Sequence, residues 1–492
     1  MAITPRTRVP ARTWPWTRAP DQHIGWAALL LTLSAAVGLA AGIKPSIGVA
    51  LAIGAAFSLV TISDVTAGLV LFTILSFLDV LNSSSSGSAS FIKVAGLLLF
   101  GSWYAQRLVG TASTRAAVGR IPANLVVCVV ALALWSALSV TWAESSGAAV
   151  TATLSFVLNM LLLPIVMVAV RRREHLYWVL AAFLAGAIIS TAYGFISPAA
   201  TGSVDGRLAG GIGDANEQAA VLVAAIPIAL ALGNAMQRPA LRLLAWSGGV
   251  FCLIGVFTTL SRGGLIALGC VLVAAVAFGG RWRPKAAALL AVTLLGTVTY
   301  YFALAPLAAR ERVTSATTSG RSDIWRVGWR MVEAHPFIGS GSGNFQQAAI
   351  HYVQGIGSIT SANFIVNVPH VAHNVYLEML ADLGIPGLLA FVGVAFFSLL
   401  AAAKAAHNFE RSGDRDMELV ARCLVLSVVA FMSADFFLSG EFSKQLWLTF
   451  ALCPAVLALS QIRDPEPARA APASRPAPGL GPDPGHRPQP AY

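Results

Sequence analysis

Apolar runs of about 15 to 22 residues alternate with short polar connectors along most of the chain. A helix that crosses a bilayer needs roughly 20 apolar residues, so each run is a candidate span. Some runs are short, 91–105 most clearly, and 46–81 could form a hairpin. We therefore expect an all-α fold, a polytopic bundle of 12–14 transmembrane helices. The candidate spans are residues 24–43, 46–62, 65–81, 91–105, 122–142, 150–170, 175–196, 217–234, 241–259, 263–279, 286–305, 385–403, 417–438 and 445–461.

The composition of the chain is typical of a membrane protein. Hydrophobic residues make up 56% of the chain and charged residues only 11%, against about 25% charged in an average soluble domain. These values exclude a large soluble core, a secreted disulfide scaffold and a nucleic-acid module. The five cysteines all fall inside apolar runs, so we interpret them as small core residues.

Lysine and arginine gather on alternate connectors. With the N-terminus inside the cell, 22 of the 33 basic residues face the cytoplasm, 10 face outward, and Arg422 lies within a span. Cytoplasmic loops of membrane proteins carry such an excess. The pattern predicts a multi-pass protein of the plasma (inner) membrane with both termini in the cytoplasm. Topology then accounts for the net charge of +11, and no nucleic acid is needed as a partner.

The runs divide the chain into five parts. We expect a basic cytoplasmic tail at 1–23, a transmembrane bundle at 24–305, a large external loop at 306–384, further transmembrane helices at 385–462 and a tail at 463–492. The final tail holds nine prolines and cannot build a packed segment, so it is expected to be disordered. The external loop spans 79 residues and holds four of the eight histidines, and loops of this length are usually functional.

Three outward segments carry charge that the edge of the bilayer does not require. They contain Arg207, Arg262 and Arg321, and the third also contains His373. Arg262 stands between two apolar runs, where a charge is costly unless it is paired or hydrated. It is a functional candidate, although an arginine that reaches the headgroups and caps a helix hairpin is the alternative.

The end of the external loop predicts a helix that begins near His373 and continues to a Gly-Ile-Pro-Gly break. An isolated histidine is often structural, and spacing alone leaves both readings open for His373 and for His370. A metal site needs three or four close ligands, and these two histidines are too few. The glycine-rich HPFIGSGSGNF segment lacks the strand and helix of a nucleotide loop, so we interpret it as a turn.

Four blocks resemble the O-antigen ligase and polysaccharide polymerase superfamily. They are RLAGGIGDANEQAA at 207–220, SRGG at 261–264, GRSDIW with HPFIGSGSGNF at 320–345, and HNVYLEMLADLGIPGLL at 373–389. The similarity covers roughly residues 205–400, and the N-terminal half agrees only in topology. Each block is weak alone, whereas their order and spacing relative to the spans make the resemblance specific.

The resemblance implies a membrane glycosyltransferase. Such an enzyme moves a glycan from an undecaprenyl-diphosphate carrier to an acceptor hydroxyl at the outer face of the plasma membrane, within membrane lipids. A ligase uses a lipid-linked acceptor sugar, and a polymerase uses a carrier-linked one; the sequence leaves the two open. The family is thought to work without a metal ion, and we expect no cofactor. The only Asp-X-Asp triplet, Asp414 to Asp416, lies on the predicted cytoplasmic side.

The resemblance also implies roles for residues. Arg262 and Arg321, with Arg207, would meet the charge of the departing diphosphate, because guanidinium groups bind phosphate in bidentate fashion. His373 would take the proton of the acceptor hydroxyl. A single displacement would invert the anomeric carbon. Further candidates for binding substrate are Asn374, Asn216 and His370.

The alternative from another class is a polytopic transporter or exporter of polysaccharide or small anions. Ionisable residues near or within the spans could belong to an ion path, although helix ends and helix pairs explain them as well. They are Asp79, Lys93, Arg422 and Asp435. Transporters commonly show internal repeats and paired broken helices, and neither pattern is clear in this sequence.

Overall fold

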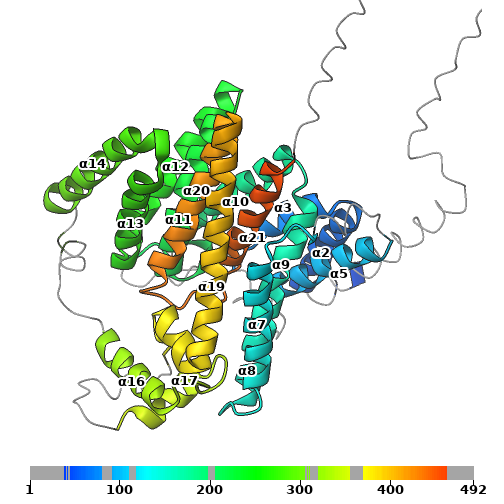
Figure 1. The fold of residues 1–492 in the computed structure, drawn as a ribbon, viewed down its shortest axis with the longest axis vertical. Coiled ribbons are helices and arrows are strands. Elements are labelled where there is room, and N and C mark those ends of the chain that lie inside the picture. The colour runs from blue at the N-terminus through cyan, green and yellow to red at the C-terminus, as the bar shows by residue number, and fades with distance from the viewer. Residues whose placement is uncertain are drawn as a thin grey trace, which may run out of the picture.

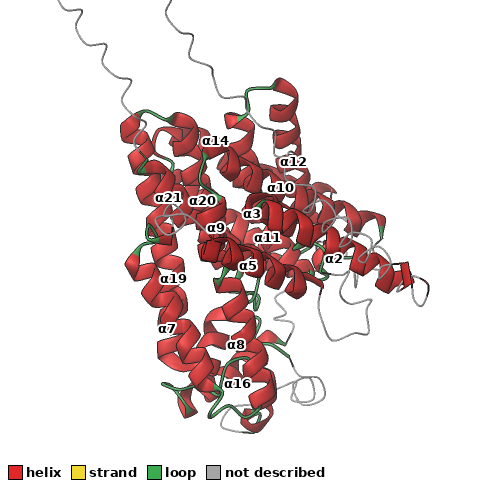
Figure 2. Cartoon of the chain, turned by 90° about the vertical axis from the view of Figure 1, so that its right-hand side faces the viewer, coloured by secondary structure: helices red, strands yellow, loops and turns green. Residues whose placement is uncertain are grey.

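The computed structural model describes residues 45–79, 91–109, 118–197, 206–304, 320–354 and 370–462, with residues 38, 39, 42, 307 and 310. Within these ranges every regular segment is a helix (Figures 1 and 2). Seven helices are long and apolar enough to cross a membrane, and six further apolar helices have 10–17 residues. The predicted all-α, multi-span fold is confirmed. Nearly all of the span predicted at 24–43 and both predicted tails lie outside the described residues.

The first half of the described chain forms a group of seven helices. They are α2 (Pro45–Ser63), α3 (Val65–Leu75), α5 (Phe91–Val109), α7 (Ala123–Ser139), α8 (Ser146–Met160), α9 (Leu162–Ala169) and α10 (Arg173–Ile196). Only Leu161 separates α8 from α9, and together they make one apolar stretch of 24 residues. Helices α2, α3, α5, α7, α8 and α9 lie along one side of the bundle, and α10 lies between this group and α11 (Figure 1).

The second half begins with the short helix η1 (Gly210–Ile212) and contains long helices connected in part by shorter ones. The long helices are α11 (Ala215–Ala235), α12 (Pro239–Thr258), α13 (Arg262–Phe278), α14 (Arg283–Thr299), α19 (Val375–Ser412), α20 (Arg415–Ala434) and α21 (Lys444–Ser460). The shorter helices are η2 (Gly280–Trp282), η3 (Tyr300–Leu304), α16 (Arg321–Ala334), α17 (Phe345–Ala348) and η4 (Ala349–Tyr352).

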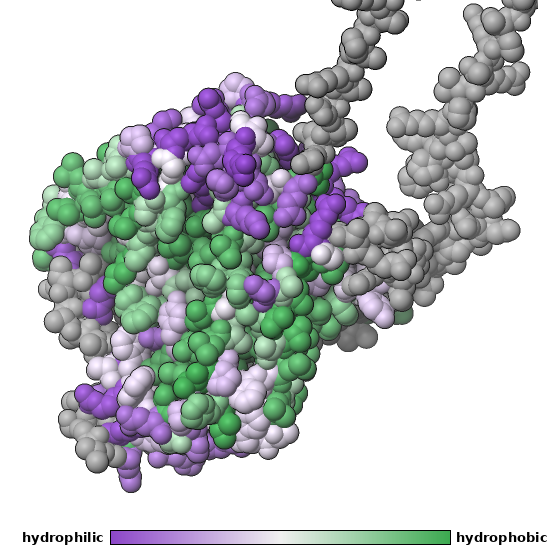
Figure 3. All heavy atoms as spheres, in the orientation of Figure 1, coloured by the Kyte–Doolittle hydropathy of each residue, from purple (hydrophilic) through white to green (hydrophobic). Residues whose placement is uncertain are grey.

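Burial sorts the long helices by their place in the bundle. In α11, 78% of the apolar window is buried, whereas the window containing α14 is 6% buried. A helix that is apolar on all sides suits either a protein interior or lipid. Helix α11 lies in the interior of the bundle, whereas α14 exposes its apolar side chains, as a helix in contact with lipid does. Figure 1 shows α14 at the margin of the bundle. Figure 3 shows hydrophobic side chains in a broad band between two more polar ends of the molecule.

The segment between α14 and α19 packs on the N-terminal end of α19 through a small core of its own. Apolar residues of α16 and α17 meet Ala372 and Ala381 in this core. The indole Nε1 of Trp325 donates a hydrogen bond of 3.0 Å to the carbonyl of Ala372. Helix α16 therefore rests on the segment that contains the predicted catalytic histidine.

A break in α19 holds the glycine-rich turn in place. Gly384 has φ 65° and ψ −169° inside the helix, a conformation essentially confined to glycine. The amides of Ser340 and Gly341 donate to the carbonyls of Ala381 and Asp382 at 2.9 and 2.8 Å. The amide of Ile385 donates to the carbonyl of Pro336 at 2.9 Å. The expected turn and helix break thus pair with each other.

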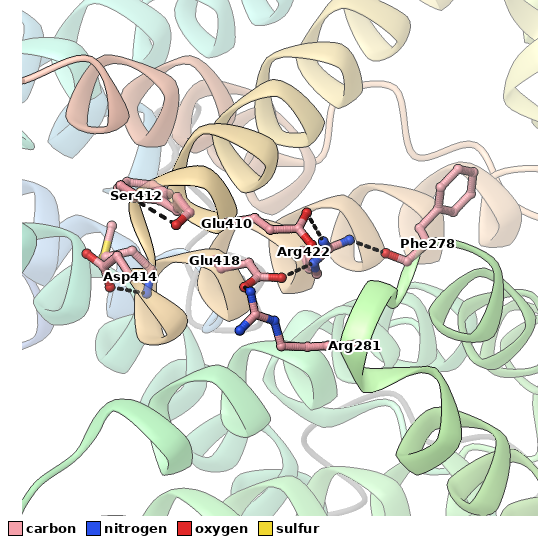
Figure 4. Close-up of polar contacts among 9 residues, drawn as sticks. Phe278, Arg281, Glu410, Ser412, Asp414, Glu418 and Arg422 are labelled. Atoms are coloured by element: carbon pink, nitrogen blue, oxygen red, sulfur yellow. Dashed lines mark hydrogen bonds and ion pairs between the residues drawn. The ribbon is translucent and has the colours of Figure 1, made fainter.

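Arg422 joins three helices at the opposite end of the bundle (Figure 4). Its guanidinium donates to Glu418 and Glu410 at 3.0 Å each and to the carbonyl of Phe278 at 2.5 Å. Glu418 is fully buried and lies 2.9 Å from Arg281. Removal of Arg422 would leave this carboxylate with one fewer partner in a poorly solvated place, which is strongly unfavourable. The cluster therefore fixes α13, α19 and α20 relative to one another.

Candidate active site

Arg262 is the first residue of α13. Ser261 caps the helix, since its Oγ accepts a hydrogen bond of 3.2 Å from the amide of Gly264. A Cβ atom at Gly264 would lie 2.6 Å from the Cβ of Ala219 in α11. The start of α13 therefore packs closely against α11 at Gly264.

Asn216 connects Arg207 to the same helix start. Its Oδ1 accepts from Arg207 Nη2 at 2.8 Å and from Ser261 Oγ at 2.9 Å. Arg207 Nε also donates to the carbonyl of Thr259 at 3.0 Å. The structure thus brings Arg207 and Asn216 to the beginning of α13, and Asn216 orients the arginine by contact.

Arg321 begins α16 and lies within the electrostatic reach of Arg262. Burial lowers the pKa of the Arg321 guanidinium, and the charge of Arg262 lowers this pKa further. The carboxylate of Asp214 acts in the opposite direction. Two guanidinium groups brought together in a partly buried place repel each other, and such an arrangement is typical of a site for an anion.

His373 has an unusual backbone conformation that neighbouring groups maintain. Its φ is 49°, a value that is uncommon for a residue other than glycine. Its amide donates to Ser439 Oγ at 3.0 Å, and this hydroxyl in turn donates to the carboxylate of Glu378. The same carboxylate accepts from the amide of Ala372 at 3.2 Å. Glu378 and Ser439 therefore act on the backbone that carries the imidazole.

Several groups set the charge of the His373 imidazole. Burial lowers its pKa from the ordinary value, the charge of Arg321 lowers it further, and His370 adds a smaller effect in the same direction. Asp214 raises it. The pKa of His370 is lowered by burial. A histidine with a lowered pKa is neutral near pH 7, and only the neutral imidazole can accept a proton.

Asn374 has a structural contact in addition to its predicted role. Its side-chain Oδ1 accepts from the amide of Leu377 at 3.1 Å and caps α19. The cap occupies the oxygen, so the amide nitrogen is the group that could donate to a sugar. Binding of substrate by Asn374 stays a prediction.

The predicted site residues form two connected groups on one face. Arg262, Arg321, His370 and His373 share an electrostatic environment with Asp214, and Arg207 joins Arg262 through Asn216 and Ser261. Sequence reasoning missed four contributors: Asp214, Ser261, Glu378 and Ser439. Asp214 could have been noticed as an acidic helix cap before α11, whereas Ser439 lies 66 residues after His373 and gives no signal in the sequence.

Two of the four ionisable residues that suggested an ion path, Asp79 and Arg422, have charged partners. Lys444 Nζ lies 2.9 and 2.8 Å from the two carboxylate oxygens of Asp79, and Arg422 joins helices as described above. Asp435 is buried at the end of α20. The side chain of Lys93 is outside the described part of the structure.

Comparison with known proteins gives one family. Residues 248–392 match the model of a family described as O-antigen ligase, and no curated protein matches the chain. The matched range runs from α12 into α19 and includes Arg262, Arg321, His370, His373 and Asn374. The resemblance to the O-antigen ligase-like superfamily is confirmed. The match supports a membrane enzyme of the O-antigen ligase or polymerase type that acts on lipid-linked glycans.

Proposed function

We propose that this protein transfers a glycan from an undecaprenyl-diphosphate carrier to a sugar hydroxyl at the outer face of the plasma membrane. The observation that supports this most is that Arg321 lies within electrostatic reach of Arg262, His373 and Asp214, and that burial and Arg321 lower the pKa of His373. The family match supports the same class of reaction. The inner membrane, the cytoplasmic termini and the external loop belong to the proposal.

The arginines stabilise the negative charge of the leaving group. As the bond between the anomeric carbon and the diphosphate oxygen breaks, negative charge grows on the diphosphate. Arg262 and Arg321 offer fixed positive charge there, and guanidinium groups fit phosphate oxygens in bidentate fashion. Arg207 supports the same region, since Asn216 and the carbonyl of Thr259 hold it against the start of α13.

His373 serves as the base. The acceptor hydroxyl gives its proton to the imidazole as its oxygen attacks the anomeric carbon, and the carrier diphosphate leaves from the opposite side. This single displacement inverts the configuration at that carbon. The lowered pKa of His373 keeps the imidazole neutral before the reaction. Ligase and polymerase activity differ in the acceptor, and both use this chemistry.

Replacing Arg262 with alanine tests the assignment of the diphosphate site. We expect transfer to fall on the order of 10²-fold or more, as for loss of other groups that stabilise transition-state charge, and carrier-linked glycan to accumulate. The measurement is glycan in lipid extracts and at the cell surface. Arg242→Ala is the control, because Arg242 stacks over Trp246 far from the site at the start of α12. Transfer at the wild-type rate by Arg262→Ala would overturn the assignment.

A further inference from the structure

A polar cavity of about 200 Å³ lies beside the candidate active site. It is bounded by Asp79 in the segment after α3, by η1, by the start of α11 and by the loop that leads into α21. Asp79, Glu217 and Lys444 contribute charged groups to its lining, and Phe442 contributes an aromatic ring. These side chains have no role in the transfer chemistry proposed above.

Two contacts connect the cavity to that chemistry. Ser439 lines the cavity, and its hydroxyl accepts the hydrogen bond of 3.0 Å from the amide of His373. On another wall, Glu217 directly follows Asn216, which orients Arg207. The cavity therefore shares Ser439 with the backbone of the proposed base, and its wall in α11 begins one residue after the side chain that orients Arg207.

The lining offers donors and acceptors in a mixed arrangement. Two of the three donors of the Lys444 ammonium are used by the carboxylate of Asp79, which leaves the third for a ligand. Glu217 is half-buried, and no group in the described part of the chain donates a hydrogen bond to its carboxylate. A half-buried carboxylate favours a ligand that brings hydroxyl donors.

Charge and size narrow the class of ligand. The lining holds the Lys444 ammonium, the Asp79 carboxylate that it contacts and the carboxyl group of Glu217. It therefore offers no excess of positive charge to a diphosphate, and the ammonium disfavours a metal cation. A volume of about 200 Å³ is below the roughly 300–1,000 Å³ of pockets for drug-sized ligands. One small, neutral ligand rich in hydroxyl groups fits these conditions.

We propose that this cavity binds one neutral sugar ring of the acceptor glycan. Glu217 accepts hydrogen bonds from ring hydroxyls, Lys444 donates to a ring or hydroxyl oxygen, and Phe442 covers an apolar face of the ring. The inference rests on the proposed function, because the cavity places an acceptor hydroxyl beside His373. It adds a subsite that is separate from the arginines of the carrier diphosphate.

Saturation-transfer NMR on the full-length protein in lipid nanodiscs tests the subsite. The probes are free hexoses, pentoses and N-acetylhexosamines at millimolar concentration. We expect at least one sugar to bind the wild-type protein and Glu217→Gln to weaken that binding about tenfold, since one of the two carboxyl oxygens that accept from ring hydroxyls is lost. Glu144→Gln is the control, because Glu144 is an outer carboxylate that contacts His351 and lies outside the cavity.

The outcomes separate this inference from the proposed function. Sugar binding that persists in Arg262→Ala and in saturating undecaprenyl diphosphate supports a separate acceptor subsite. The inference is overturned if no sugar binds, if Glu217→Gln binds as the wild type does, or if undecaprenyl diphosphate displaces the sugar. None of these results depends on transfer, whereas the proposed function fails only when the Arg262 or His373 variants transfer glycan normally.

Discussion

His373 and Leu260 are the two non-glycine residues with positive φ in the described part of the chain, each at 49°. Leu260 directly precedes the cap of α13, and His373 precedes the cap of α19. Residues held in sparsely populated conformations cost of order 1–3 kcal/mol and cluster at functional sites. Here the surrounding hydrogen bonds maintain the strained backbone of His373, which fixes where its imidazole stands.

Asp214 allows a test of how charge sets the pKa of His373. Its carboxylate raises that pKa, so Asp214→Asn should lower it further. The neutral imidazole then persists to lower pH, and the acid limb of the rate profile should move to lower pH. Asparagine caps helices as well as aspartate does, so α11 should remain intact. The measurement is glycan transfer in membranes as a function of pH.

Glu144→Gln provides the comparison for this profile, because it also removes an outer carboxylate and Glu144 does not act on His373. Its acid limb should coincide with that of the wild type. An acid limb that moves to higher pH in Asp214→Asn, or stays in place, would contradict the electrostatic assignment.

The sequence predicted which residues belong to the candidate site better than it predicted the groups that they contact. The sequence indicated the arginines and His373 because charge is scarce in an apolar chain and because the motifs carry it. It did not indicate Glu378 and Ser439, since a hydrogen bond from the amide of His373 depends on how the loop after α20 folds back. Asn374 was expected at a sugar, and its oxygen caps a helix.

Replacing Gly384 tests whether the break in α19 and the segment around Phe337 depend on each other. Gly384→Ala would place a Cβ 2.3 Å from the carbonyl oxygen of Phe337 and would force alanine into φ 65°. We expect a loss of stability of about 2 kcal/mol or more from the strain and the clash. Gly269→Ala, a helical position with nothing within 4 Å, should be neutral or slightly stabilising.

Thermal unfolding of the detergent-solubilised variants measures both effects. Equal unfolding temperatures of the two variants would contradict the stabilising role of the break at Gly384.

Helices were predictable where apolar length alone decides them. The runs at 122–142, 175–196 and 241–259 correspond to α7, α10 and α12 because each run must satisfy its backbone within a helix in lipid. The structure of the segment between α14 and α19 could not be predicted from apolar length. Its packing of α16 on the segment before α19 depends on contacts between residues distant in sequence, such as Trp325 with Ala372.

The distribution of charge predicts which face of the molecule meets the outside. Trp329 in α16 is 55% exposed, and Arg411 lies exposed near the other end of α19. In a Cys270→Ser background, Trp329→Cys should react in intact cells with a thiol reagent that does not cross membranes. Arg411→Cys should react only after the membrane is opened. The reverse pattern would contradict the orientation set by the basic loops.

The arginines and His373 lie near the starts of α13 and α19, whereas the Arg422 cluster joins the other end of α13 to α19 and α20. The two groups of charged residues are therefore separate in space. The sequence likewise predicts a larger set of basic residues that sets the orientation and a smaller set that takes part in the chemistry. How the two parts of the outer site meet follows from the packing of α11, α13 and α19, which the sequence alone does not give.

The most direct test of the transferase is His373→Ala measured against His351→Ala. Both histidines belong to the outer segment, but His351 is exposed and contacts Glu144. In membranes supplied with carrier-linked glycan, His373→Ala should lower transfer on the order of 10²–10⁴-fold, as expected for loss of a general base. His351→Ala should transfer at the wild-type rate. Undiminished transfer by His373→Ala, at equal protein level, would contradict the assignment of His373 as the base.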